Sequence, residues 1–208
     1  MNNSWDYIST GIHTLYEIAG ILLLVGISLS VKQLKISKQE SSYRARRDHY
    51  EQTVKSLEDY STRILRSQEV YYEQAAKQNQ NGYSLINTKN FEKYFEENKF
   101  NVNLMELTPE ELEESFWRID SGVLTVLHQI EFYSMMMTQG LSDEKIAFHI
   151  TSDDFCNFVK SNYLSICILK RKLPFENTIN LFEMWHARME YKNIKMYISP
   201  DYELIKSR

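Results

Sequence analysis

One long apolar segment stands near the start of the chain, ahead of a stretch dominated by polar and charged residues. Residues 12–31 read IHTLYEIAGILLLVGISLSV. At a helical rise of about 1.5 Å per residue, about 20 residues cross the ~30 Å hydrocarbon layer of a membrane. Insertion of its Leu, Ile and Val side chains is favourable, while the single carboxylate, Glu17, opposes insertion by about 3 kcal/mol at most. The pattern predicts one transmembrane helix.

Two other interpretations of this segment stay open. A cleaved signal peptide also has an apolar core, but basic residues before that core and a small-residue cleavage site after it are missing here. A buried core helix also fits, because the strictly apolar part, residues 18–30, is shorter than a full span. We retain the membrane span as the prediction.

The charges on either side of the segment predict its orientation. Asp6 is the only charged side chain before His13, whereas the span is followed by six basic residues: Lys32, Lys35, Lys38, Arg44, Arg46 and Arg47. Basic flanks stay on the cytoplasmic side. We therefore expect a single-pass protein of the cell inner membrane, with its N-terminus outside and its C-terminal domain in the cytoplasm. The basic cluster would lie against anionic lipid headgroups.

His13 and Glu17 form a candidate intramembrane polar site. They lie one helical turn apart near the outer end of the predicted span. Ionisable groups inside membranes often face a partner helix or a polar lumen. Side chains at this depth also reach the headgroup region, and we prefer that interpretation to a pore.

The next segment, residues 32–80, contains no Gly or Pro and many charged side chains, which favours one long helix. Apolar residues recur along it every seven positions, at Tyr43, Tyr50, Leu57, Ile64 and Tyr71. The second row that a coiled coil requires is mostly polar. A parallel coiled coil and a helix packed along its own domain both fit, and a single apolar row is enough for the second.

A polar turn separates this helix from a second helical region. Residues 79–84, NQNGYS, contain Asn-Gly and interrupt the periodicity. Residues 88–99 are predicted to form a short amphipathic helix. The sequence TPEE at residues 108–111 combines an N-cap, a first-turn proline and two carboxylates that favour a helix start. Apolar spacing then predicts one core helix that continues to Gly140.

The remaining residues indicate further helices. Ser142 lies at the start of a short helix, Ser152 or Asp153 caps the next one, and Asn177 is a candidate cap for the last. No strand pattern appears apart from a weak run at residues 195–198. We therefore predict an all-α chain in three parts: residues 1–31, a short outer tail and transmembrane helix; residues 32–80, a long basic, amphipathic helix; and residues 81–208, a compact cytoplasmic helical domain.

Composition and motifs restrict the classes of function. A net charge of -4 and a pI near 5.8 argue against a nucleic-acid partner. The two cysteines, Cys156 and Cys167, match no CxxC or metal-ligand pattern, so we expect free thiols. No phosphate-binding loop, dinucleotide motif or hydrolase motif occurs. We expect no enzyme activity and no cofactor, and we identify no small-molecule substrate.

His128 and Glu131 are the most prominent polar pair in the predicted core helix. Their spacing of three residues places them on one helix face. Di-metal sites in helical bundles use Glu-x-x-His, but the order is reversed here and the partner carboxylates are not evident. We expect no metal-binding and no catalytic residue here. We interpret the pair as a structural or interaction pair that joins the core helix to a neighbour through hydrogen bonds.

Three features occur together in this chain: Leu127, His128 and Glu131, the sequence GLSDE at residues 140–144, and a membrane helix ahead of a charged linker. On these features the chain resembles the bacterial family known as domain of unknown function 4760. These motifs cover about half of the chain. The family pattern has Asn after the Leu where this chain has His128. The resemblance implies a membrane-anchored helical protein without an established activity, and some such proteins look like accessories or effectors of antiphage defence.

We consider three functions. The first is a membrane-tethered helical interaction or regulatory module that binds a protein partner or a second copy of the chain. The alternative is a membrane-disrupting, pore-forming defence effector that oligomerises through the span and the long helix, with His13 and Glu17 lining the pore. The third is a membrane-bound enzyme with a site that the sequence does not display.

Overall fold

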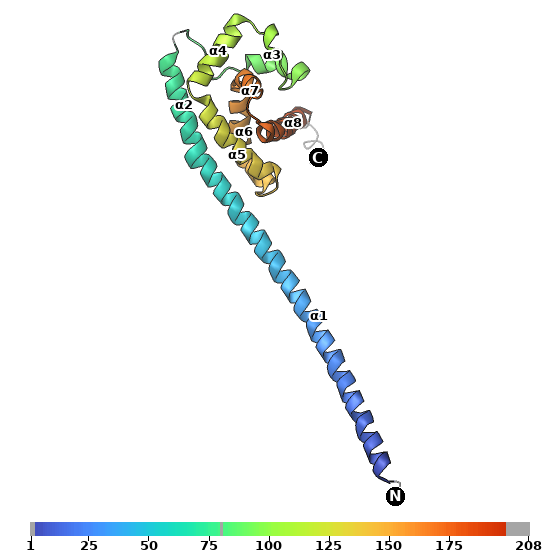
Figure 1. Cartoon of the computed structure of the whole chain (residues 1–208). Coiled ribbons are helices and arrows are strands. Elements are labelled where there is room, and N and C mark those ends of the chain that lie inside the picture. Colours follow the sequence, from blue (N-terminus) through green and yellow to red (C-terminus); the bar gives the residue numbers. More distant parts are fainter. Residues whose placement is uncertain (1–2, 80, 199–208) are drawn as a thin grey trace, which may run out of the picture. The chain divides into compact units, whose positions relative to one another are not determined.

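The computed structural model describes residues 3–79 and 81–198, and their side chains for residues 26–79 and 81–191. Every regular element within those ranges is helical and no strand occurs in them (Figure 1). The weak strand pattern at residues 195–198 belongs to the last helix. The predicted all-α class is confirmed.

The chain divides into two compact units, Met1–Asp48 and His49–Arg208. Helix α1 (Asn3–Asp59) begins in the first unit and ends in the second, and residues 12–31 are helical within it. In the part of the chain whose side chains are described, no helix is both long and apolar enough to cross a membrane. The side chains of residues 12–25, most of the predicted span, lie outside the described residues.

The long helix predicted over residues 32–80 is present, with one irregular turn. After α1 the chain forms a π-helical turn, η1 (Tyr60–Ile64), and then α2 (Leu65–Gln78). In the second unit this helical stretch packs along its own domain: Tyr60, Ile64 and Tyr71 are 2–4% exposed. The compact second unit therefore begins within the long helix, ahead of the turn at residues 79–84.

The break predicted at residues 79–84 is confirmed. The Asn79 side chain closes this turn, because its Oδ1 accepts from the Tyr83 N–H (2.8 Å) and its Nδ2 donates to the Tyr83 carbonyl (2.6 Å). Such side-chain to backbone bonds explain the preference for Asn in turns. The chain continues into α3 (Lys89–Asn98) and a 3-10 turn, η2 (Leu104–Glu106).

The predicted helix start at residues 108–111 is confirmed as a capping box. The Glu111 N–H donates to Thr108 Oγ1 (3.2 Å), and the Thr108 N–H donates to the Glu111 carboxylate (2.8 Å). The prediction of a single helix to Gly140 was wrong: α4 (Pro109–Asp120) and α5 (Val123–Thr138) are separate. Gly122 lies between them with φ +98°, a left-handed conformation that ends a right-handed helix.

The C-terminal helices differ from the prediction in their boundaries. Helix α6 (Glu144–Ser161) is long, with Asp143 as its N-cap. Ser152 and Asp153 lie inside α6 and cap nothing, because its buried row continues across them from Phe148 to Phe155. Two more helices follow, α7 (Tyr163–Leu169) and α8 (Glu176–Ile198). Because α8 already begins at Glu176, Asn177 is not its N-cap.

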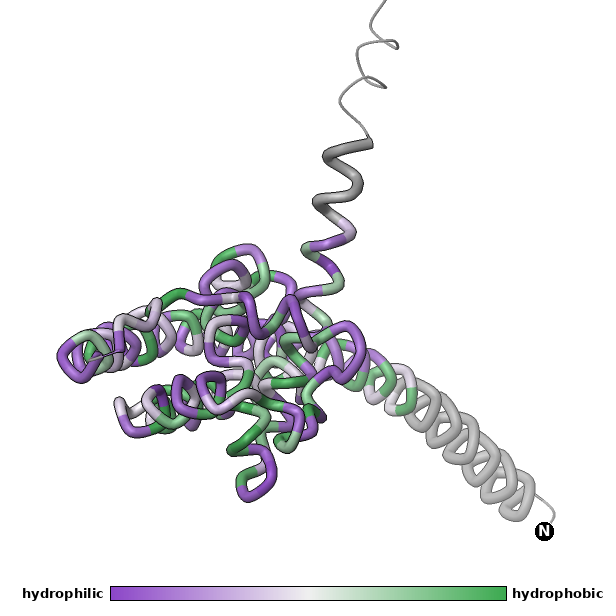
Figure 2. Tube along the Cα trace, turned by 90° about the horizontal axis from the view of Figure 1, so that it is seen from above, coloured by the Kyte–Doolittle hydropathy of each residue, from purple (hydrophilic) through white to green (hydrophobic). Residues whose placement is uncertain are grey.

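Helix α5 is the centre of the second unit. It contacts η1, α2, α4, α6 and α8, and it runs antiparallel to α2 (Figure 1). Its residues Leu127 and Ile130 are fully buried, as are Phe182 and Trp185 of α8. Burial of each such side chain contributes about 1.5–3 kcal/mol. Hydrophobic and hydrophilic positions are interleaved along these helices, as amphipathic helices around a common core require (Figure 2).

Candidate functional site

A groove runs between the long helix and α5, entirely within the second unit. It encloses about 230 Å³. The long helix contributes one wall and α5 the other: Gln52, Ser56, Asp59, Arg63 and Ile64 line the first, and His128, Gln129, Phe132, Tyr133 and Met136 line the second. Ile64, Tyr133 and Met136 are buried, whereas the Phe132 ring is 60% exposed. The groove is therefore apolar at its base and exposes an aromatic ring at its edge.

Polar groups surround this apolar base. Asp59 and Arg63 form an exposed ion pair of 3.8 Å along the helix. The Oε1 atom of Gln129 is buried and accepts no hydrogen bond from any described residue. An unsatisfied buried acceptor costs about 1–3 kcal/mol.

A second hollow, of about 530 Å³, adjoins the groove, because Arg63 and Gln129 line both. Its walls include Arg66, Gln74 and Gly122, from α2 and the start of α5. Arg66 is exposed. It adds one positive charge beside the groove, where Arg63 and Asp59 offset each other.

The structure gives His128 and Glu131 separate surroundings. The Glu131 carboxylate accepts hydrogen bonds from the backbone N–H groups of Asn177 (3.1 Å) and Thr178 (2.8 Å), and from both of their side chains. It thereby satisfies N–H groups in the first turn of α8. His128 instead is exposed in the groove, with its ring 5.9 Å from that of Phe175. Glu131 holds two helices together, and His128 is available to a partner.

The six basic residues that follow the predicted span all lie on α1 and are all exposed: Lys32, Lys35, Lys38, Arg44, Arg46 and Arg47. Two of them pair along the helix, Arg44 with Glu40 and Arg47 with Asp48, each at 3.9 Å. Exposed pairs of this kind contribute at most about 1 kcal/mol. The side chains of His13 and Glu17 lie outside the described residues.

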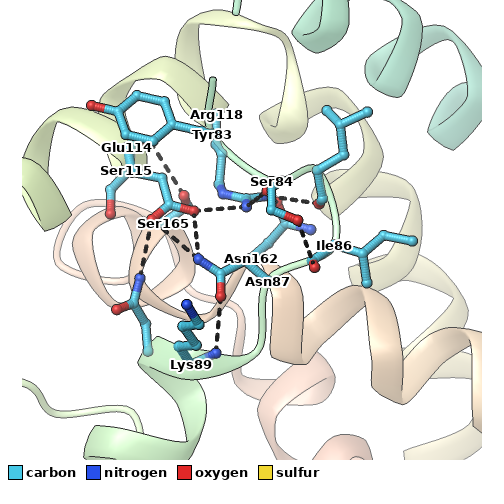
Figure 3. A network of polar contacts seen from close by, with 12 residues as sticks. Tyr83, Ser84, Ile86, Asn87, Lys89, Glu114, Ser115, Arg118, Asn162 and Ser165 are labelled. Atoms are coloured by element: carbon cyan, nitrogen blue, oxygen red, sulfur yellow. Dashed lines mark hydrogen bonds and ion pairs between the residues drawn. The ribbon is translucent and has the colours of Figure 1, made fainter. Parts of the chain in front are cut away.

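A buried charge network, not predicted from the sequence, holds the loop after α2 against α4 (Figure 3). Arg118 is 2% exposed, and its Nη2 donates to Glu114 (2.9 Å) and to the Ser84 carbonyl (2.8 Å). Its Nη1 donates to the Leu85 carbonyl (3.2 Å). In the sequence, the only sign of this network is the four-residue spacing of Glu114 and Arg118 on α4. Because the pair is buried, removal of one partner would cost about 3–5 kcal/mol.

The two thiols do not form a nucleophilic site. Cys156 and Cys167 are free, as expected, and both are buried. Burial raises the pKa of each thiol to about 12, so both are protonated at neutral pH and react poorly. Among the residues that the structure describes, no group of three or more His, Cys, Asp and Glu side chains could hold a metal ion.

The groove combines a small apolar cavity with an exposed aromatic ring at its edge, and Arg66 lies in the adjoining hollow. These features suit recognition of an apolar group with an acidic neighbour. No protein-family model, no curated protein and no solved structure matches the chain, so the resemblance to domain of unknown function 4760 stays an expectation.

Proposed function

We propose that this chain is a membrane-tethered interaction module whose second unit binds a partner protein in the groove between the long helix and α5. The observation that carries the proposal is the Phe132 ring, 60% exposed beside a buried apolar base. Aromatic side chains at the edge of a cavity are typical of the central contacts of protein interfaces.

The size and charge of the groove support a protein partner rather than a cofactor. Its volume of about 230 Å³ falls below the roughly 300–1,000 Å³ of small-molecule pockets. One or two apolar side chains of an amphipathic helix fit this space. Arg66 in the adjoining hollow carries a positive charge that Asp59, paired with Arg63, does not offset, so we expect a carboxylate beside the inserted side chain.

The tether is supported by the apolar sequence of residues 12–31 and by the exposed basic residues that follow it. An apolar segment of this length inserts readily. Attraction of the basic cluster to anionic headgroups adds about 1 kcal/mol for each side chain near the surface. Tethering confines the groove to a partner located at or recruited to the membrane.

Site-specific photo-crosslinking tests the groove. Benzoylphenylalanine replaces Phe132 in the full chain, and in a control it replaces Ile150 of α6, which is 65% exposed. We expect a discrete adduct from position 132 only, and its loss when Arg63→Glu reverses the charge beside the groove. An adduct of twice the chain mass would identify a second copy as the occupant. Equal labelling from both positions, or none, would contradict the proposal.

Membrane extraction tests the tether independently. In the full chain, Leu23→Arg with Ile27→Arg places two charges in the span, at about 2.5–3.5 kcal/mol each. We expect the wild type to resist alkaline washing of membranes and the double variant to be released. The matched control, Ser41→Arg with Ser42→Arg, stays bound. Depolarisation of cells by the wild type that Glu17→Leu abolishes would instead support the pore-forming effector.

A further inference from the structure

Another hollow of the second unit, formed by α4 and the loop after α2, has a chemistry unlike that of the groove. It encloses about 410 Å³, within the usual range for small-molecule sites. Four of its residues come from α4: Glu113, Phe116, Trp117 and Asp120. Their spacing of three, four and seven residues places them on a single face of that helix. The loop after α2 completes the hollow with Asn81 and Tyr83.

Aromatic rings form a large part of this hollow. The Tyr83 and Trp117 rings lie with centroids 5.5 Å apart and planes tilted by 39°. Phe116 adds a third ring, 52% exposed. The faces of aromatic rings carry negative potential and attract cations within about 6 Å. Three rings around one space are thus suited to a positively charged organic group.

The charged side chains around the hollow are negative, as a cationic ligand requires. Glu113 and Asp120 line it, and none of the described side chains that line it is basic. The nearest arginine, Arg118, lies over the Trp117 ring at 5.3 Å, but it is buried and paired with Glu114. Glu113 accepts a hydrogen bond from Asn81 Nδ2 (3.0 Å), which orients the carboxylate. A cation in this space would meet two uncompensated carboxylates.

The hollow is held in shape before any ligand binds. Figure 3 shows Arg118 tying the loop that follows Tyr83 to α4, through the Ser84 carbonyl and Glu114. Asn87 adds a further bond from the loop to Glu114 (3.3 Å). Because these contacts fix Tyr83 relative to Trp117, binding needs little further ordering.

We propose that this hollow binds a methylated organic ammonium group, as in choline. The aromatic rings receive the ammonium, and Glu113 and Asp120 balance its charge. Free choline and the headgroup of phosphatidylcholine share this chemistry, and the experiment below distinguishes them.

Calorimetric titration of the detergent-solubilised full chain with choline is the first arm. We expect saturable binding, and no binding of 3,3-dimethylbutan-1-ol, a neutral analogue with carbon in place of nitrogen. Glu113→Gln and Asp120→Asn should each raise the dissociation constant roughly fivefold. The control Glu97→Gln, an exposed carboxylate on α3, should leave it unchanged. Phe116→Leu, also on the surface, should weaken binding while the helical circular dichroism is retained.

Mixed micelles of phosphatidylcholine or phosphatidylglycerol form the second arm, with Trp fluorescence as the readout. A fluorescence change with phosphatidylcholine alone, lost in Trp117→Phe, would identify the lipid headgroup as the source. A response to free choline alone would identify the soluble ligand. Equal affinity for choline and its neutral analogue, or no saturable signal in either arm, would overturn the proposal.

Discussion

Two stretches of the long helix have the same apolar spacing, but one is exposed to solvent and the other is buried. Tyr43 and Tyr50 are 71% and 60% exposed, whereas Ile64 and Tyr71, in the same seven-residue row, are 4% and 2% exposed. Spacing identifies the face of a helix on which apolar residues gather. Whether that face is buried depends on what packs opposite it, and the row itself contains no such information.

The partners of the buried stretch come from distant parts of the sequence. The Tyr71 hydroxyl donates to Asn162 Oδ1 (2.8 Å), 91 residues away, and the Tyr60 hydroxyl donates to Asp154 (2.6 Å), 94 residues away. The Tyr60 ring also packs on Tyr133 of α5, with centroids 4.7 Å apart. The buried tyrosines therefore belong to the core of the second unit.

The largest expected difference in stability between the two stretches comes from truncation of one aromatic ring in each. Tyr71→Ala leaves a cavity in the core and should lower the free energy of unfolding by about 3–5 kcal/mol, as for other buried aromatic residues. Tyr43→Ala should change it by no more than about 0.5 kcal/mol. Urea denaturation of the full chain followed by circular dichroism measures both. Equal losses would show that the exposed stretch is packed in solution.

A smaller change separates the polar contribution from packing. Tyr71→Phe keeps the ring but removes the hydroxyl that donates to Asn162 and accepts from Arg118 (3.4 Å). We expect a loss of about 1–3 kcal/mol, because buried groups lose a partner. Tyr50→Phe is the matched control and should have no effect in the same urea titration. A loss below the error of the measurement would mean that water replaces the hydroxyl.

The smallest expected effect concerns ionisation in the core. Burial raises the pKa of the Cys156 and Cys167 thiols from 9.0 to about 12. Each contributes stability that is fully present below pH 9 and is lost as the pH rises toward 12, about 1 kcal/mol per thiol by pH 10. Burial also raises the pKa of core tyrosines such as Tyr72 and Tyr133, so urea titrations at pH 8 and pH 10 compare the wild type with Cys156→Ala and Cys167→Ala. A loss of stability with pH that is no smaller without the thiol would contradict its protonated, buried state.

Thiol labelling at pH 8 compares the reactivity of buried and exposed positions. Cys156 and Cys167 should react with a thiol reagent only on unfolding, whereas a cysteine introduced as Tyr43→Cys should react at once.

Local patterns were sufficient to predict the helical class, the long helix, the turn after Gln78 and the helix start at Thr108. They failed where one residue or a distant contact decides the structure. Gly122 divides the predicted core helix because of its left-handed backbone, although the apolar spacing continues past it. Ser152 and Asp153 are cap-forming residue types that lie within α6. Neither outcome follows from spacing.

The candidate sites were predicted only in part for the same reason. His128 was singled out from its spacing with Glu131, but its groove is completed by the long helix, more than 60 positions earlier in the chain. The Arg118 network and the aromatic hollow join α4 to a loop whose path no local pattern specifies. Contacts between helices, rather than helical propensity, create these sites.

The Glu131 carboxylate that caps α8 affects how the second unit unfolds locally. Helix ends usually fray independently of the rest of a protein, and their amides exchange with solvent rapidly. The Asn177 and Thr178 amides instead donate to a side chain of the central helix, 46 and 47 residues earlier. Their hydrogens can exchange only when α5 and α8 separate. The two helices should therefore unfold as one cooperative unit, with the start of α8 protected as strongly as the interior of α5.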